Sequence, residues 1–180
     1  MATPAGTRAE VRTAIEAFFN ARIADATIPT LGTVYGFPEK IMDEADMFAN
    51  VQPGIQDGAF LFIHLMHSSD LLIALGGPSD GRKWVEYECT LSLVFRSLKP
   101  SAIDAGEDNE TMLDAIVASI RKYRTCGTTD GTIFQWGLGS RNGGTDIEVE
   151  SFYPQDLHAS KSATQILTLI KLKVAQEIQA

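Results

Sequence analysis

The sequence has no long apolar run and almost no cysteine, and each shortage excludes a class of protein. No run approaches the roughly 20 apolar residues that a membrane span needs. The first residues, MATPAGTRAEVR, lack the apolar centre of a signal peptide. Two cysteines, Cys89 and Cys126, are too few for a disulfide scaffold or a four-cysteine zinc site. These absences predict an intracellular protein with two reduced thiols and no membrane partner.

Positive charge is also scarce. The chain has 15 Lys and Arg against 23 Asp and Glu, a formal net charge of −8. This charge argues against tight wrapping of nucleic acid, because phosphate binding needs clustered Lys and Arg. A surface along which nucleic acid slides without sticking remains compatible with this charge. What is present, 180 residues of which 44% are hydrophobic, is typical of one globular domain over residues 1–180.

Two segments have the periodicity of amphipathic helices. In the first, at about residues 7–22, Thr7 and Glu10 have capping-box spacing, and apolar residues recur along one face. The second, at about residues 108–124, has acids at its start and Arg and Lys at its end, as the helix dipole favours. The polar residues 99–110 before it are expected to be an acidic loop.

Residues 24–57 have a different composition. Three prolines, several glycines and short apolar patches predict a long irregular arm or loop, with a brief strand at 31–36. This arm and the loop at 99–110 could reach neighbouring subunits or be ordinary surface loops.

From residue 59 the pattern changes to that of a sheet. In KWVEYECTLSLVF, residues 83–95, apolar odd positions alternate with mostly polar even ones, which predicts a strand with one face on a core. Residues 164–179 are interpreted as a strand, with a helix as the alternative. The intervening GSRNGG carries a hairpin signal, and the other strand candidates are residues 59–67, 68–77, 131–138 and 145–152. The sum is an α+β fold, a mostly antiparallel sheet of about five to seven strands with two main helices packed on it.

Residues 76–83 read G-x-x-x-x-G-R-K, one step from the phosphate-binding loop of nucleotide hydrolases. That loop needs a helix N-terminus directly after it, whereas the residues that follow here alternate as a strand. Trp84 stands where the Mg²⁺-binding hydroxyl would be, and Pro78 removes one backbone N–H. The motif is therefore interpreted as the loop of a β-hairpin.

The remaining candidate chemistry is weak. His64 and His67 are three residues apart, a spacing that points them to opposite faces of a strand. Cys126 and Ser79 are the exposed-looking nucleophile candidates, yet neither has a local histidine partner. The carboxylates Asp43, Glu44 and Asp46, and Glu107, Asp108 and Glu110, are interpreted as solvated or helix-capping groups. We therefore expect no catalytic, metal or cofactor site, and no enzyme.

The order of the parts is more informative than any single site. An N-terminal helix precedes TLGTVYGFP, then a strand, then IALGGPSDGRKWVEYECTLSL, then a helix that ends in a short Arg/Lys run, two short strands and a closing strand. Over nearly the whole chain this order resembles the tail terminator proteins of long-tailed bacteriophages, particularly of phages that infect actinobacteria. The hairpin around residues 76–83 carries most of the resemblance.

The resemblance implies a structural role. Tail terminators form a hexameric ring that caps the head-proximal end of the tail tube, stops its polymerisation and joins the tail to the head connector. The implied partners are other copies of the chain, the major tail tube protein, head completion or connector proteins, and DNA that passes through the lumen without specific binding. The implied location is the tail neck of the virion, after assembly in the host cytoplasm.

Two residues are candidates for subunit or ring contacts. Trp84 and Val94 are the apolar exceptions on the nominally polar face of the strand at residues 83–95, and such residues often mark interfaces. Helices that covered this face would be the alternative explanation. Two other functions stay open: another head–tail joining or tail-tube protein of the same fold, or a small enzyme with a dispersed site.

Overall fold

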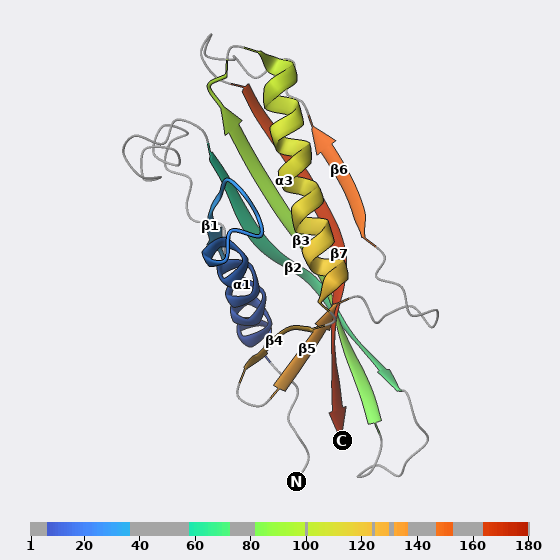
Figure 1. Ribbon diagram of the computed structural model, residues 1–180. Helices are drawn as coiled ribbons and strands as arrows, with labels where there is room; N and C mark the ends of the chain where they lie inside the picture. The colour runs from blue at the N-terminus through green and yellow to red at the C-terminus, as the bar shows by residue number, and fades with distance from the viewer. Residues whose placement is uncertain are drawn as a thin grey trace.

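The computed structural model describes residues 7–36, 58–72, 82–99, 101–123, 125–129, 132–136, 147–152 and 164–179. These residues form an α+β fold of two helices and a seven-stranded sheet (Figure 1). The elements are, in chain order, α1 (Arg8–Ala24), β1 (Leu31–Tyr35), β2 (Gly58–Leu72), β3 (Arg82–Ser97), α3 (Ala102–Lys122), β4 (Thr125–Thr129), β5 (Thr132–Trp136), β6 (Glu148–Phe152) and β7 (Thr164–Gln179). The predicted fold class is confirmed, and residues 164–179 form a strand rather than a helix.

The last described strand, β7, lies in the middle of the sheet. The strand order is β1-β2-β3-β7-β5-β4, and β6 also pairs with β7. Along one side, β7 pairs with β3 from Thr164 to Gln179 without a register shift. Along the other side it pairs with β6 near its start and with β5 near its end. All pairs are antiparallel except β1 with β2, so the prediction of a mostly antiparallel sheet is confirmed.

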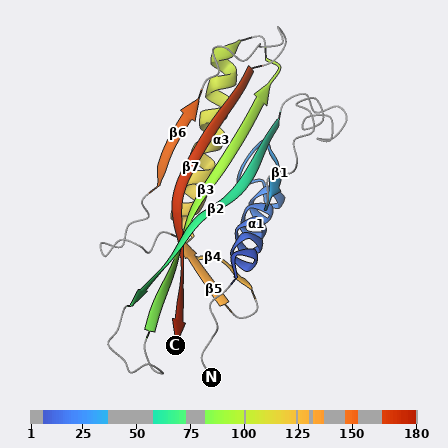
Figure 2. The ribbon, with the colours of Figure 1, turned by 180° about the vertical axis from the view of Figure 1, so that it is seen from behind.

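Three strands are long and extend past the helices. β3 and β7 each have 16 residues, which corresponds to about 50 Å at 3.3 Å per residue. In both views the end of β2, the start of β3 and the end of β7 continue beyond α1 and α3 (Figures 1 and 2). The hairpin loop predicted at 76–83 joins β2 to β3 at this end. Residues 73–81 lie outside the described residues, but the pairing of Leu72 with Lys83 confirms the hairpin, and Arg82 and Lys83 belong to β3 rather than to the loop.

The first helix forms as the sequence predicts. Thr7 is its N-cap: the Thr7 side chain accepts a hydrogen bond from the Glu10 N–H, and the Glu10 carboxylate accepts one from the Thr7 N–H. This reciprocal arrangement satisfies N–H groups that have no partner within the helix. The apolar stripe from Val11 to Phe19 is buried, so α1 is fixed to the sheet along one face.

The second helix begins earlier than predicted. α3 starts at Ala102 rather than near residue 108, so most of the expected acidic loop at 99–110 is helical. Ser101 is the N-cap and its hydroxyl accepts a hydrogen bond from the Asp104 N–H at 3.3 Å. Ala105 and Asn109 then continue the buried stripe one turn at a time. The many polar residues of this segment lie on the exposed side of a helix, which is why they resembled a loop.

Two details of the small strands differ from prediction. The strands at 132–136 and 148–152 form, but they do not pair with each other within the described part of the chain, so the hairpin inferred from GSRNGG is wrong. Both strands pair with β7 instead. β7 has 16 residues, so β6 can pair with residues 167–171 and β5 with residues 174–175 on the same side of it. Strand β4 was not predicted, and it pairs with β5 across Asp130-Gly131.

The core lies on one face of the sheet, between the strands and both helices. Odd-numbered residues of β3 and even-numbered residues of β7 pack there with the apolar stripes of α1 and α3. Seen from behind, the long strands lie in front and α3 lies behind them (Figure 2). Neither helix in the described ranges combines the length and apolar character that a membrane span requires.

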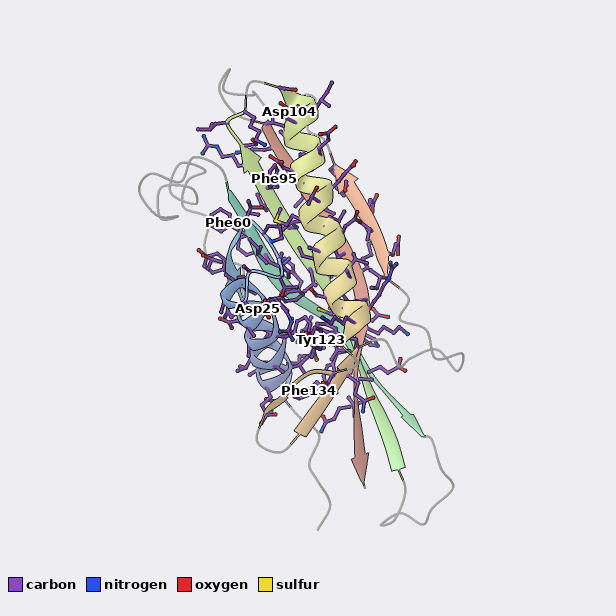
Figure 3. The ribbon with its side chains drawn as sticks, in the orientation of Figure 1. Asp25, Phe60, Phe95, Asp104, Tyr123 and Phe134 are labelled. Atoms are coloured by element: carbon purple, nitrogen blue, oxygen red, sulfur yellow. The ribbon has the colours of Figure 1, made fainter. Side chains whose placement is uncertain are left out.

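An aromatic cluster joins the two helices to β5. Trp136 on β5 packs edge-on against Phe18 of α1, with ring centroids 5.3 Å apart, and Phe18 packs against Tyr123 at the end of α3 at 5.8 Å. The Arg22 guanidinium lies 3.9 Å from the centre of the Tyr123 ring, a cation–π distance. It also donates a hydrogen bond to Asp25 at 3.0 Å. Figure 3 shows Tyr123 between the C-terminal end of α3 and α1.

Both cysteines belong to the core. Cys89 and Cys126 are unpaired thiols and both are buried. The prediction of two free thiols is confirmed, and the expectation that Cys126 is exposed is wrong. Burial raises the pKa of Cys89 to about 12 and also raises the pKa of Cys126. Neither sulfur is therefore a thiolate at neutral pH.

This burial predicts unreactive thiols in the native protein. At pH 8, a thiol reagent such as Ellman's reagent is expected to titrate both cysteines within minutes in 8 M urea and neither in buffer over the same time. Absorbance at 412 nm gives the count. Rapid modification of a thiol in buffer would contradict the buried position of that side chain.

Candidate interaction surface

The face of the sheet opposite the two helices, here called the helix-free face, carries the even-numbered residues of β2 before its bulge and of β3, and the odd-numbered residues of β7. Alternation places them there because successive side chains of a strand point to opposite faces. Much of this face is polar, as the alternation in residues 83–95 predicts. Towards the start of β2 and of β7, however, the helix-free face is apolar. This apolar part is the candidate interaction surface.

Four apolar residues lie side by side across four strands of this face. Phe60 of β2 pairs with Val94 of β3, Val94 pairs with Leu167 of β7, and Leu167 pairs with Phe152 of β6. We call these four residues the apolar row. Its accessibility rises along the row, because Phe60 is 1% exposed, Val94 is half-buried, Leu167 is 38% exposed and Phe152 is 43% exposed. The accessible part of the row therefore lies at its β7–β6 end.

An aromatic corner borders the row on the β1 side. The Tyr35 ring stacks on Phe62 with centroids 5.2 Å apart and an interplanar angle of 15°, and it lies 6.1 Å from the ring of Phe60. Phe62 is the next residue of β2 on the same face as Phe60. Figure 3 labels Phe60 on β2, on the side of the sheet nearest to β1. These rings give the closed end of the row a rigid border.

Ion pairs border the row in the other direction along the strands. The Lys171 ammonium lies 3.2 Å from a carboxylate oxygen of Glu148 and 3.5 Å from one of Glu150. Its hydrogen bond to Glu148 raises the pKa of Lys171. Further along, Lys173 contacts the buried Glu86 carboxylate at 3.3 Å. The lysines of β7 are thus already matched to carboxylates on this face.

A β-bulge changes the predicted arrangement of the two histidines of β2. The register shifts between Leu65 and His67, so His64 pairs with Thr90 and His67 with Glu88. Thr90 and Glu88 are two residues apart on β3 and share a face, which places both histidines on the helix-free face. The prediction of opposite faces is therefore wrong, because the bulge adds one residue between the two histidines and so returns the His67 side chain to the face on which His64 lies. In the described ranges no three His, Cys, Asp or Glu side chains gather into a metal-binding group.

His64 gives the folded protein a pH dependence. Its pKa is lowered from 6.5, mainly because the side chain is partly buried and secondarily by the positive charge of Arg12. The unfolded chain therefore binds more protons at this position below about pH 6.5, so the stability contributed by neutral His64 is present above pH 6.5 and is lost as the pH falls through the lower folded-state pKa.

The substitution His64→Gln is expected to reduce the loss of stability between pH 7.5 and pH 5.5. Urea midpoints measured by circular dichroism at the two pH values report this difference. The matched control is His67→Gln, because His67 is exposed on the same strand, and this variant is expected to retain the wild-type drop. An unchanged drop in His64→Gln would show that His64 does not contribute.

The two residues predicted as contacts lie at different ends of β3. Val94 is a member of the apolar row. The backbone of Trp84 pairs with Leu71 and Glu177 in the part of the sheet that extends past the helices, and its side chain lies outside the described residues. The alternative, that helices cover this face too, is wrong for α1 and α3, which pack on the other face.

The other candidate residues do not form a site in the described residues. Glu107 and Glu110 are exposed on α3, and Asp108 forms an ion pair with Lys99, so these carboxylates have the solvated role that was predicted. Asp43, Glu44, Asp46 and Ser79 lie outside the described residues, as does most of the arm predicted at 24–57. Within that arm, the brief strand predicted at 31–36 is β1.

The fold also tests whether residues 76–83 could be a phosphate-binding loop. The residues after the glycine-rich stretch form β3 from Arg82 onward, so no helix N-terminus follows it, as predicted. No protein-family model and no curated protein matches this chain.

Proposed function

We propose that this chain is a structural virion protein that forms a ring at the head-proximal end of a bacteriophage tail tube. In this role it stops tube polymerisation and joins the tail to the head connector, while DNA passes through the lumen of the ring. The observation that carries the proposal is the helix-free face with its accessible apolar row. A ring subunit needs such surfaces for its neighbours, and contiguous exposed apolar residues mark interaction sites.

The chain order of the elements supports the tail-terminator resemblance. The resemblance centres on a hairpin around residues 76–83, preceded by an N-terminal helix and followed by a helix, two short strands and a closing strand. The antiparallel pairing of β2 with β3 and the elements α3, β5, β6 and β7 follow that order. Strand β4 is an addition to it.

The charge of the chain suits a passage for DNA. The net charge is −8, and the exposed side of α3 carries carboxylates along its first half. A lumen that bound phosphates would hold the genome back, whereas a like-charged wall prevents sticking. The proposed ring therefore contacts DNA without specific binding and needs no cofactor. Its partners are other copies of the chain, six in the complete ring, the major tail tube protein and the head completion or connector proteins, in the virion neck after assembly in the host cytoplasm.

Mass measurement tests this proposal. The purified protein is examined by native mass spectrometry alone and after mixing with its tail tube subunit, and tube lengths are measured by electron microscopy. We expect a ring of defined mass under at least one condition, and tubes that stop growing once the protein is added. A monomer under both conditions, beside tubes of unlimited length, would overturn the proposal.

A further inference from the structure

The exposed apolar residues of the helix-free face are adjacent rather than scattered. Leu167 and Phe152 are direct cross-strand partners, and Val94 lies on the other side of Leu167. Among the described strands β6 pairs with β7 alone, so the open end of the row lies at an edge of the sheet. A partner can therefore cover the row from the face and from the edge. Such an apolar centre with a polar border is the usual anatomy of a protein interface.

The distribution of charged side chains indicates which partner the apolar row can bind. On the outer side of α3, Asp104, Glu107, Glu110 and Asp114 are all exposed, and Figure 3 labels Asp104 in the first turn of that helix. Two copies of a chain of net charge −8 would repel each other there. Beside the apolar row, Lys171 and Lys173 lie within 3.5 Å of three carboxylates, those of Glu148, Glu150 and Glu86, and offset two of their three negative charges. Of the two broad sides of the molecule, this one can meet an acidic copy of the same chain with the least repulsion.

The same charges argue against nucleic acid as the occupant. Lys171 and Lys173 already hold Glu148, Glu150 and Glu86 within 3.5 Å. A phosphate backbone would have to displace these carboxylates and would then face them as like charges. Anionic lipid headgroups meet the same obstacle.

We infer that the accessible part of the apolar row, Val94, Leu167 and Phe152, is a contact between neighbouring copies of this chain. This inference rests on the proposed ring and names the surface through which one subunit meets the next. Leu167 is its centre, because it has an apolar neighbour on each side. In the assembled ring the Leu167 and Phe152 side chains are covered, and the ion pairs of Lys171 lie at the rim of the contact.

Substitution of Leu167 with glutamate tests the contact. A charge at the centre of an apolar contact weakens it strongly, so we expect assembly to require a protein concentration about 30-fold higher than for the wild type. Native mass spectrometry over a dilution series measures this shift. Met66→Glu is the matched control, because Met66 is also an exposed apolar residue, 68% accessible, but lies at the bulge of β2 outside the row. It is expected to assemble as the wild type does.

Site-specific crosslinking tests the same contact without disrupting it. In Leu167→Cys the introduced thiol is accessible, while Cys89 and Cys126 are buried, so a benzophenone maleimide labels position 167 selectively. Illumination of the assembled protein is expected to yield a covalent dimer of the chain. Far-ultraviolet circular dichroism establishes that each variant is folded before its mass is interpreted.

The outcomes separate this inference from the proposed function. If Leu167→Glu assembles like the wild type and Leu167→Cys gives no dimer, the inference is overturned while the ring remains. If Leu167→Glu forms rings of normal mass that no longer stop tube growth, the row contacts the tube instead, which also overturns the inference. A wild-type protein that stays monomeric with its tube subunit overturns both.

Discussion

Replacement of Trp136 with alanine is expected to lower the free energy of unfolding by about 3 to 5 kcal/mol. The Trp136 side chain is 3% exposed and packs against Phe18 and Phe19, with ring centroids 5.3 and 6.2 Å away. Its removal leaves a cavity where α1, the end of α3 and β5 meet. Because Phe18 also contacts Tyr123, the loss extends to the contact between the helices.

Urea unfolding followed by far-ultraviolet circular dichroism measures this effect, since fluorescence would lose one of only two tryptophans. Trp136→Phe is the control. It keeps a ring in the cluster and removes an indole N–H that has no hydrogen-bond partner in the described part of the chain, so we expect a loss below about 1.5 kcal/mol. Equal losses in the two variants would contradict the ring packing as the cause. All samples are compared at one protein concentration, because assembly adds stability by mass action.

Replacement of Asn109 with leucine is expected to raise the free energy of unfolding by about 1 to 3 kcal/mol. Asn109 lies on the buried stripe of α3 and is fully buried. Neither atom of its amide group has a hydrogen-bond partner among the described residues. Leucine removes this unsatisfied group, keeps the same number of side-chain heavy atoms and has a higher helix propensity.

The matched control for Asn109→Leu is Thr111→Leu, at an exposed position of the same helix. It carries a similar gain in helix propensity without a change in burial, and its expected effect is within about 0.5 kcal/mol. Thermal unfolding by circular dichroism compares both variants with the wild type. A destabilised Asn109→Leu would mean that the amide has a partner such as a buried water, and that the stripe of α3 is satisfied as it stands.

Local patterns in the sequence predicted the elements whose causes are local. The capping box of Thr7 and Glu10 placed the start of α1, and the alternation in residues 83–95 placed β3. The start of α3 was missed because its N-cap, Ser101, and its buried Asn109 are polar residues in a polar stretch. Strand β4 was missed because Thr125–Thr129 has little apolar content, although Asp130-Gly131 after it is a strong hairpin signal.

The candidate surface depends on register, which a local pattern does not contain. Val94 was identified because it interrupts the polar positions of its own strand. Leu167 and Phe152 were not, because their adjacency to Val94 follows from the pairing of β6, β7 and β3. A partial signal existed in Leu167 and Leu169, which occupy the outward positions of a strand whose neighbouring inward positions, except Thr168, are already apolar. The bulge in β2 that brings His64 and His67 to one face left no comparable signal.

The central position of β7 has a consequence for synthesis on the ribosome. β7 follows every other described strand in the chain, yet it fills the gap between β3 and the pair β5–β4 and supports β6. Until it emerges, β3 presents a free edge of 16 residues, which is an aggregation hazard for a nascent chain. Because Leu167 belongs to this strand and Phe152 is held by it, a chain whose translation stops before Thr164 lacks the apolar row. Unfinished chains therefore cannot use that surface to enter an assembly.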